Sequence, residues 1–107
     1  MRRYLGLYEL RYSPYFKKKI KKMDKKARKR IENAILDLRE NPYHNTEFLK
    51  GQWKGKRKLR VGDYRVVFII CEECQRLNHK TYNRCKDCGS IPPNTIIIVD
   101  LIRRHKY

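Results

Sequence analysis

Four cysteines between positions 71 and 88 have the spacing of a metal site. They form two Cys-x-x-Cys pairs, Cys71 with Cys74 and Cys85 with Cys88. Each pair can aim two thiolates at one point, and two such pairs joined by a short loop are typical of a tetrahedral four-thiolate zinc site. We therefore expect one structural Zn²⁺ per chain. Because four sulfurs leave no open coordination position, this metal is not expected to take part in catalysis.

Two disulfides, four free thiols or an iron ion are the alternatives to zinc. The N-terminal residues 1–5 are basic, but Gly6, Glu9 and Arg11 interrupt the apolar run that a secretory signal would need. We therefore expect a cytoplasmic protein, and the reducing cytoplasm disfavours disulfides. Iron can occupy the same tetrahedral geometry, so the choice between zinc and iron stays open.

A run of basic residues with the alternation of a β-strand is the second candidate site. Residues 56–61 and 64–70 read as the two strands of a hairpin, with Gly62-Asp63 as the turn. Side chains alternate along a strand and cross-strand partners share a face, so four cations are predicted on one surface. These cations are Lys56, Lys58, Arg60 and Arg65. Neighbouring like charges repel, so this surface is predicted to bind an anion such as an RNA phosphate; an ordinary solvated sheet face is the alternative.

The overall composition also favours a polyanionic partner. The 107 residues include 28 Lys and Arg against 11 Asp and Glu, which gives a formal net charge of +17. Such an excess fits nucleic acid best, because neutralised phosphates release counterions and so supply affinity. We expect no membrane partner, since no apolar run approaches the roughly 20 residues that cross a bilayer. The length predicts a single domain, residues 1–107.

Two helices are predicted before the basic hairpin, after a first strand over residues 4–12. Ser13-Pro14 begins the first helix, because serine is a good N-cap and proline suits the first helical position. Asp24 can cap the second helix. That helix must end before Asn41-Pro42, because the residue before a proline avoids the helical conformation.

The remaining segments complete the expected fold. Residues 43–55 have no clear period and are predicted to form a loop, and residues 95–102 read as the last strand. The expected fold class is α+β, with a two-helix hairpin packed on a small, mostly antiparallel four-stranded sheet in the order β-α-α-β-β-β. Residues 71–94 are predicted to form a zinc-binding insertion between the last two strands. The hairpin residues predicted to turn toward the helices are Leu59, Val61, Tyr64, Val66 and Phe68.

A set of segments along the chain carries a resemblance to one known superfamily. The segments are the strand ending in Ser13-Pro14, the helix hairpin closing on Glu40-Asn41-Pro42, Leu49-Lys50-Gly51, the run from Lys56 to Phe68 and the C-terminal Arg-x-x-x-Tyr. In these segments the chain resembles the RelE/ParE superfamily of toxins, and Leu59-Arg60-Val61-Gly62-Asp63-Tyr64-Arg65 is the most specific part. Residues 71–94 depart from the common members, in which a short turn joins these two strands.

The resemblance implies a toxin of a type II toxin–antitoxin system that cuts mRNA in the ribosome and is held inactive by a RelB-like antitoxin. The partners so implied are mRNA, the ribosome and that antitoxin. The residues that match the catalytic positions are Lys58, Arg60, Arg65, Arg103 and Tyr107, and those placed to contact RNA are Lys54, Lys56, Arg104 and His105. The implied chemistry is metal-independent attack of a ribose 2′-OH on the adjacent phosphate.

Two other functions stay open from the sequence. ParE-type members of the superfamily inhibit DNA gyrase and cut no RNA, whereas Lys56 and Lys58 favour the RNA-cutting branch. A non-catalytic zinc-knuckle protein that binds RNA or the ribosome is the other alternative, and the cysteine-containing insertion favours it. Such a binding protein would show tight, salt-sensitive binding and leave the RNA intact.

Overall fold

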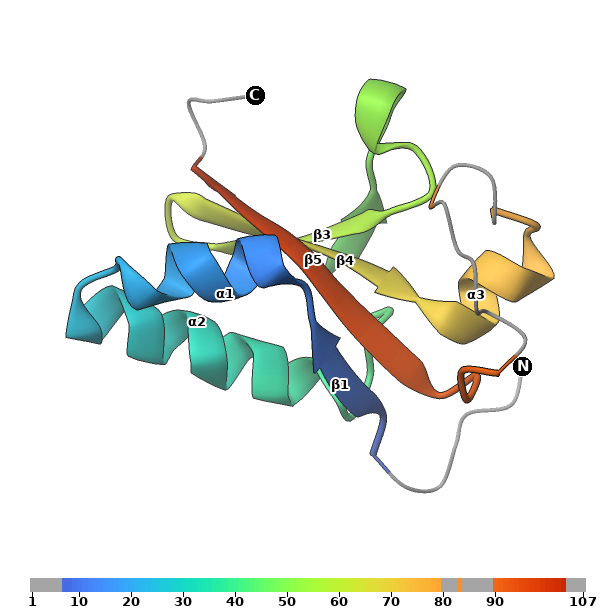
Figure 1. The fold of residues 1–107 in the computed structure, drawn as a ribbon, viewed down its shortest axis with the longest axis horizontal. Coiled ribbons are helices and arrows are strands. Elements are labelled where there is room, and N and C mark those ends of the chain that lie inside the picture. The colour runs from blue at the N-terminus through green and yellow to red at the C-terminus, as the bar shows by residue number, and fades with distance from the viewer. Residues whose placement is uncertain (1–6, 80–82, 84–89, 104–107) are drawn as a thin grey trace.

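A computed structural model describes residues 7–79, 83 and 90–103, and Figure 1 shows its fold. Within these described residues, five strands form one sheet in the order β1-β5-β4-β3-β2. Their bounds are β1 Glu9–Tyr12, β2 Thr46–Phe48, β3 Arg57–Val61, β4 Tyr64–Ile70 and β5 Thr95–Arg103. Strand β1 runs parallel to β5, and the other neighbours are antiparallel.

The α+β class and the mostly antiparallel sheet are confirmed, but the expected number of strands is wrong. The additional strand is β2, which lies in the segment predicted to be a loop and pairs Thr46 with Leu59 and Phe48 with Arg57. A strand of three residues is too short to leave a period in the sequence. The same segment contains a turn of 3-10 helix, η1, Gly51–Trp53.

Two helices, α1 (Pro14–Lys21) and α2 (Lys25–Leu38), lie together on one face of the sheet (Figure 1). Both predicted N-caps are confirmed. The Ser13 side chain accepts a hydrogen bond from the Phe16 N–H at 3.1 Å, and Asp24 accepts one from the Ala27 N–H at 3.2 Å. No described helix is long and apolar enough to cross a membrane.

The core lies between this helix pair and the sheet. Its buried helix residues are Phe16, Ile31, Ile35 and Leu38, and its buried strand residues are Val66, Phe68, Ile70, Ile96, Ile98 and Leu101. Leu59, Val61 and Tyr64 pack against this core as predicted. The sheet face along the hairpin is therefore assigned correctly from strand alternation.

The hairpin register also follows the prediction, since Arg60 pairs with Arg65 and Val61 with Tyr64. Gly62 in the turn has φ +60°, a conformation that residues with a Cβ rarely adopt. At its C-terminal end, β4 leads directly into a short third helix, α3 (Cys71–Arg76). The residues predicted as a zinc knuckle thus begin in a helical turn.

Replacing Gly62 by alanine is expected to lower the free energy of unfolding by about 1–2 kcal/mol, because an L side chain is strained at this φ. A Cβ at this position would also lie 3.3 Å from the guanidinium nitrogens of Arg30. Urea unfolding of Gly62→Ala measures the loss. The matched control is Asp63→Ala, at the exposed second turn position, and equal unfolding midpoints for the two variants would contradict the prediction.

Candidate functional site

The basic strand surface, defined here by Lys58, Arg60 and Arg65, lies on the sheet face opposite the helices. Two cross-strand rows run over this face. Lys58 pairs with Val67 and Val67 with Asp100, while Arg60 pairs with Arg65 and Arg65 with Ile102. Arg60 is exposed and Lys58 is half-buried, so both cations are accessible to a ligand. The sequence pattern therefore places these two residues correctly.

Arg65 is not the exposed cation that the pattern predicted. It is only 2% exposed, and its Nη1 donates to the carbonyl oxygens of Tyr64 at 3.1 Å and Gly62 at 3.4 Å. Strand β4 is central in the sheet, and Val67 and Ile69 on the same face are buried as well. Strand alternation determines which face a side chain is on, but not how deeply that face is covered. Arg65 is therefore a buried residue that stabilises the hairpin turn through its hydrogen bonds.

Lys54 and Lys56 lie in the loop before β3. Lys54 is exposed, whereas Lys56 is half-buried and its Nζ donates to the Oδ1 of Asn83 at 3.0 Å. The Asn83 amide in turn donates to the Gly55 carbonyl at 3.1 Å and to the Cys74 sulfur at 3.2 Å. Lys56 is thus linked to α3 through Asn83, and it adds a further positive charge next to the basic strand surface.

Arg103 lies on the other face of the sheet from Lys58 and Arg60. It pairs with Tyr64, and its guanidinium carbon lies 5.5 Å from the centre of the Tyr64 ring. Tyr64 packs toward the helices, so the alternation of β5 turns Arg103 to that side. The structure therefore does not bring Arg103 together with the two strand cations. The other predicted tail residues, Arg104, His105 and Tyr107, lie outside the described residues.

Two of the four predicted metal ligands are described, and both lie in α3. Cys71 and Cys74 are buried, and each is 4% exposed. Residues three positions apart lie on the same side of a helix, so their sulfurs can face a common point. Cys85 and Cys88 lie outside the described residues. Within the described part of the chain, no group of three or more His, Cys, Asp or Glu could hold a metal ion.

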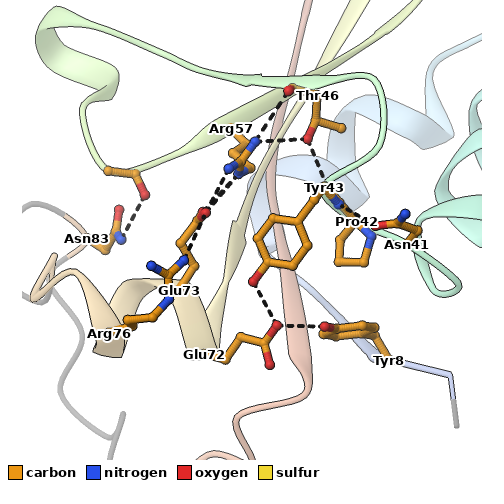
Figure 2. A network of polar contacts seen from close by, with 11 residues as sticks. Tyr8, Asn41, Pro42, Tyr43, Thr46, Arg57, Glu72, Glu73, Arg76 and Asn83 are labelled. Carbon is orange, nitrogen blue, oxygen red and sulfur yellow. Dashed lines mark hydrogen bonds and ion pairs between the residues drawn. The ribbon is translucent and has the colours of Figure 1, made fainter. Parts of the chain in front are cut away.

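The two glutamates between these cysteines hold α3 against the sheet, as Figure 2 shows. An oxygen of Glu72 accepts hydrogen bonds from the hydroxyls of Tyr8 at 2.6 Å and Tyr43 at 2.7 Å. Burial, followed by the hydrogen bond to Glu72, raises the pKa of Tyr43 above its ordinary value. The phenol therefore stays protonated and keeps its role as a donor.

Glu73 forms the second half of this network with Arg57 (Figure 2). The Arg57 Nε and Nη2 donate to the two carboxylate oxygens at 2.9 and 2.8 Å, and the two side chains are 14% and 5% exposed. The guanidinium also lies over the rings of Phe48, at 4.3 Å, and Tyr43, at 5.2 Å. Arg57 is therefore held by ionic and aromatic contacts together.

The sequence pattern did not predict this network. Tyr8 and Glu72 are 64 positions apart, so their contact leaves no local spacing. The one available signal was the pair of carboxylates inside a Cys-x-x-Cys segment of a chain rich in cations. Two adjacent acidic residues entering a buried segment require partners, because a buried charge is costly when it is unpaired.

A groove of about 880 Å³ lies beside the C-terminal end of β5. Its apolar and aromatic lining consists of Met23, Trp53, Tyr64, Leu101 and Ile102, and its charged lining of Lys19, Lys22, Lys50, Arg103, Asp24 and Asp100. Ile102 is in the same cross-strand row as Arg60 and Arg65. The groove therefore adjoins the basic strand surface.

Comparison with known proteins gives one sequence family. The family described as the ParE toxin of the type II toxin–antitoxin system parDE matches residues 10–78, which is more than half of the chain. None of the curated protein sequences matches the chain significantly.

Solved structures with this fold cover nearly the whole chain. The toxin–antitoxin complex RelBE2 from Mycobacterium tuberculosis contains a chain that matches with a TM-score of 0.69 at 16% identity, over 96% of this chain and 98% of that one. The archaeal RelE–RelB complex from Pyrococcus horikoshii gives a TM-score of 0.63 at 19% identity, over 94% and 99%. The YoeB/ParE toxin from Agrobacterium tumefaciens gives 0.61 at 14% identity, over 89% and 96%. At these identities the likeness establishes the fold.

Proposed function

The chain belongs to the ParE toxin family of type II toxin–antitoxin systems, and from this premise we propose that it is a ribosome-dependent mRNA endonuclease. The observation that carries the proposal is the pair of accessible cations, Lys58 and Arg60, on the sheet face opposite the helices. A surface that concentrates positive charge beside a groove suits a bent single-stranded RNA. The net charge of +17 supports the same partner.

The proposed reaction is a transesterification within the RNA. The ribose 2′-oxygen loses its proton and forms a bond to the adjacent phosphorus, while the bond from phosphorus to the 5′-oxygen breaks and that oxygen gains a proton. Negative charge builds up on the phosphate oxygens as the reaction proceeds. Lys58 and Arg60 are proposed to stabilise that charge. Cations stabilise a developing negative charge best when they are already held in position before the reaction.

The other predicted site residues have supporting roles in this proposal. Arg65 acts as a positioning residue. It pairs with Arg60 across the hairpin, and its hydrogen bonds to the carbonyls of Gly62 and Tyr64 hold the turn between β3 and β4. Lys54 and Lys56 are proposed to bind RNA on the approach to β3. Arg103, Arg104, His105 and Tyr107 are proposed to act from the end of β5 and the tail that follows it.

The proposed partners are mRNA, the ribosome and an acidic antitoxin of the RelB kind, expected in the neighbouring reading frame. RelB is the partner in the similar archaeal RelE–RelB complex from Pyrococcus horikoshii. The test is to incubate the purified protein with ribosomes programmed with mRNA. New mRNA fragments that the antitoxin suppresses would support the proposal, whereas intact mRNA would contradict it. Tight, salt-sensitive ribosome binding without cleavage would favour a binding module, and inhibition of DNA gyrase would favour the ParE-type activity.

We also propose that Cys71, Cys74, Cys85 and Cys88 hold one structural zinc ion. The described half of this ligand set fits such a metal. Both thiols are buried in one helical turn, and the Cys74 sulfur already accepts a hydrogen bond from Asn83, as thiolate ligands commonly do from groups around a metal. When bound, the ion would close the loop between the two cysteine pairs and add its binding free energy to folding.

Metal analysis of protein purified without chelator is expected to give about one equivalent of zinc. Cys74→Ser should lower that content and reduce the stability of the native state, because metal binding is linked to folding. Less than about half an equivalent of any metal in the wild-type protein, or a mass that shows two disulfides, would contradict the assignment. About one equivalent of iron instead would keep the site and change the metal.

A further inference from the structure

The second half of β5 lies at an edge of the described sheet. Strand β4 covers one side of β5 along its length, whereas β1 on the other side pairs with residues 95–98 and ends there, so on that side no described strand lies beside residues 99–103. An open strand edge commonly accepts an extended peptide as an additional strand. The groove described above lies along this edge.

Three backbone groups of this edge, at Val99 and Leu101, already have side-chain partners. The Ser13 hydroxyl donates to the Val99 carbonyl, and Lys19 Nζ donates to the Leu101 carbonyl at 3.1 Å. The Leu101 N–H donates to the Asp100 carboxylate at 2.7 Å. An added strand would have to displace these contacts. A ligand of this groove is therefore recognised by side chains and not by strand addition.

The charged side chains of the groove favour an anion. Both carboxylates are engaged, because Asp100 forms an ion pair with Lys19 at 2.8 Å and Asp24 caps α2. Lys22, Lys50 and Arg103 add three further cations. The groove is therefore positive overall and suits phosphate groups.

The aromatic side chains favour a nucleobase. Trp53 and Tyr64 both line the groove, and Arg103 lies over the Tyr64 ring. Grooves that combine cations with aromatic rings bind single-stranded nucleic acid, since the cations follow the backbone and the rings stack on the bases. Trp53, half-buried at the end of η1, is the ring best suited to such stacking.

We propose that this groove binds an unpaired nucleotide of single-stranded RNA, with Trp53 stacking on its base and Lys50 and Arg103 binding the flanking phosphates. The inference builds on the RNA-cutting function proposed above. It favours RNA over an acidic protein helix because the row Arg60–Arg65–Ile102 joins the groove to the basic strand surface. Tyr64 and Arg103 face the helices and Lys58 and Arg60 face away from them, so one RNA strand reaches both sites by passing the C-terminal end of β5.

The single tryptophan of the chain makes the test direct, since all indole fluorescence comes from Trp53. The probe is a short 2′-O-methyl RNA oligonucleotide, which cannot undergo 2′-OH attack, and no ribosome is present. Binding is expected to quench the fluorescence, and the affinity should fall as salt rises. Trp53→Ala should weaken binding on the order of 10-fold, measured by the anisotropy of a labelled oligonucleotide, while Trp53→Phe should retain most of it. Tyr15→Ala is the control, because Tyr15 is 72% exposed on α1, outside the groove lining.

Unchanged fluorescence while the oligonucleotide saturates the protein would overturn the inference, as would equal affinities for Trp53→Ala and the wild type. Quenching by the acidic antitoxin but not by RNA would also overturn it, and would assign the groove to a protein. The result is separable from the proposed function. Quenching without mRNA cleavage on ribosomes would support the nucleotide site alone, and cleavage without quenching would support the function alone.

Discussion

Replacing Lys58 by alanine is expected to lower the rate of mRNA cleavage on programmed ribosomes by on the order of 100-fold, the usual loss when one preorganised charge-stabilising group is removed. Lys58 lies in the middle of β3, on the face opposite the helices and two positions from Arg60. A strand in the interior of a sheet holds its side chains in fixed directions, so the charge needs no rearrangement when the transition state forms. Rates under single-turnover conditions measure the loss.

Two matched variants show whether the effect belongs to this surface. Lys26→Ala removes an equal charge from the exposed face of α2, and it should leave the rate nearly unchanged. Arg60→Ala should resemble Lys58→Ala, because Arg60 shares the same face. A Lys58→Ala protein that binds ribosomes and cleaves at the wild-type rate would remove Lys58 from the proposed site.

Replacing Glu73 by alanine is expected to lower the free energy of unfolding by about 3–5 kcal/mol, because it leaves a buried charge without its partner. The charge left behind is the guanidinium of Arg57, a side chain that is 14% exposed and that contacts the rings of Phe48 and Tyr43. Water that enters the space left by the carboxylate carries no negative charge to balance the guanidinium. Urea unfolding followed by circular dichroism measures the change.

The controls separate the buried pair from ordinary surface charge. Arg76 lies 3.9 Å from the same carboxylate but is 56% exposed, so Arg76→Ala should cost less than about 1 kcal/mol. Replacing both partners, as in Arg57→Met/Glu73→Leu, should recover part of the stability lost in Glu73→Ala, because no buried charge is then left unpaired. Equal stabilities for Glu73→Ala and Arg76→Ala would contradict the assigned role of the pair.

Some features of this protein follow from local sequence alone. Ser13 and Asp24 cap their helices because a capping side chain needs only the N–H of a residue three positions ahead. The register of the basic hairpin follows from a two-residue turn, and its two faces follow from strict alternation. The local sequence alone therefore places Lys58 and Arg60 on one face of the hairpin.

Other features depended on contacts between distant segments, and only the tertiary structure decided them. Arg65 has the right face but is buried, because β4 is central and covered, which alternation does not report. Arg103 pairs with Tyr64 and so lies on the opposite face. This pairing depends on the register between β4 and β5, and those two strands are not joined by a two-residue turn that would fix it. Strand β2, the contacts of Glu72 and Glu73, and the groove around Trp53 likewise join residues from separate parts of the chain. Local periodicity determines the direction of a side chain, whereas its burial and its partners are set by the elements that pack against it.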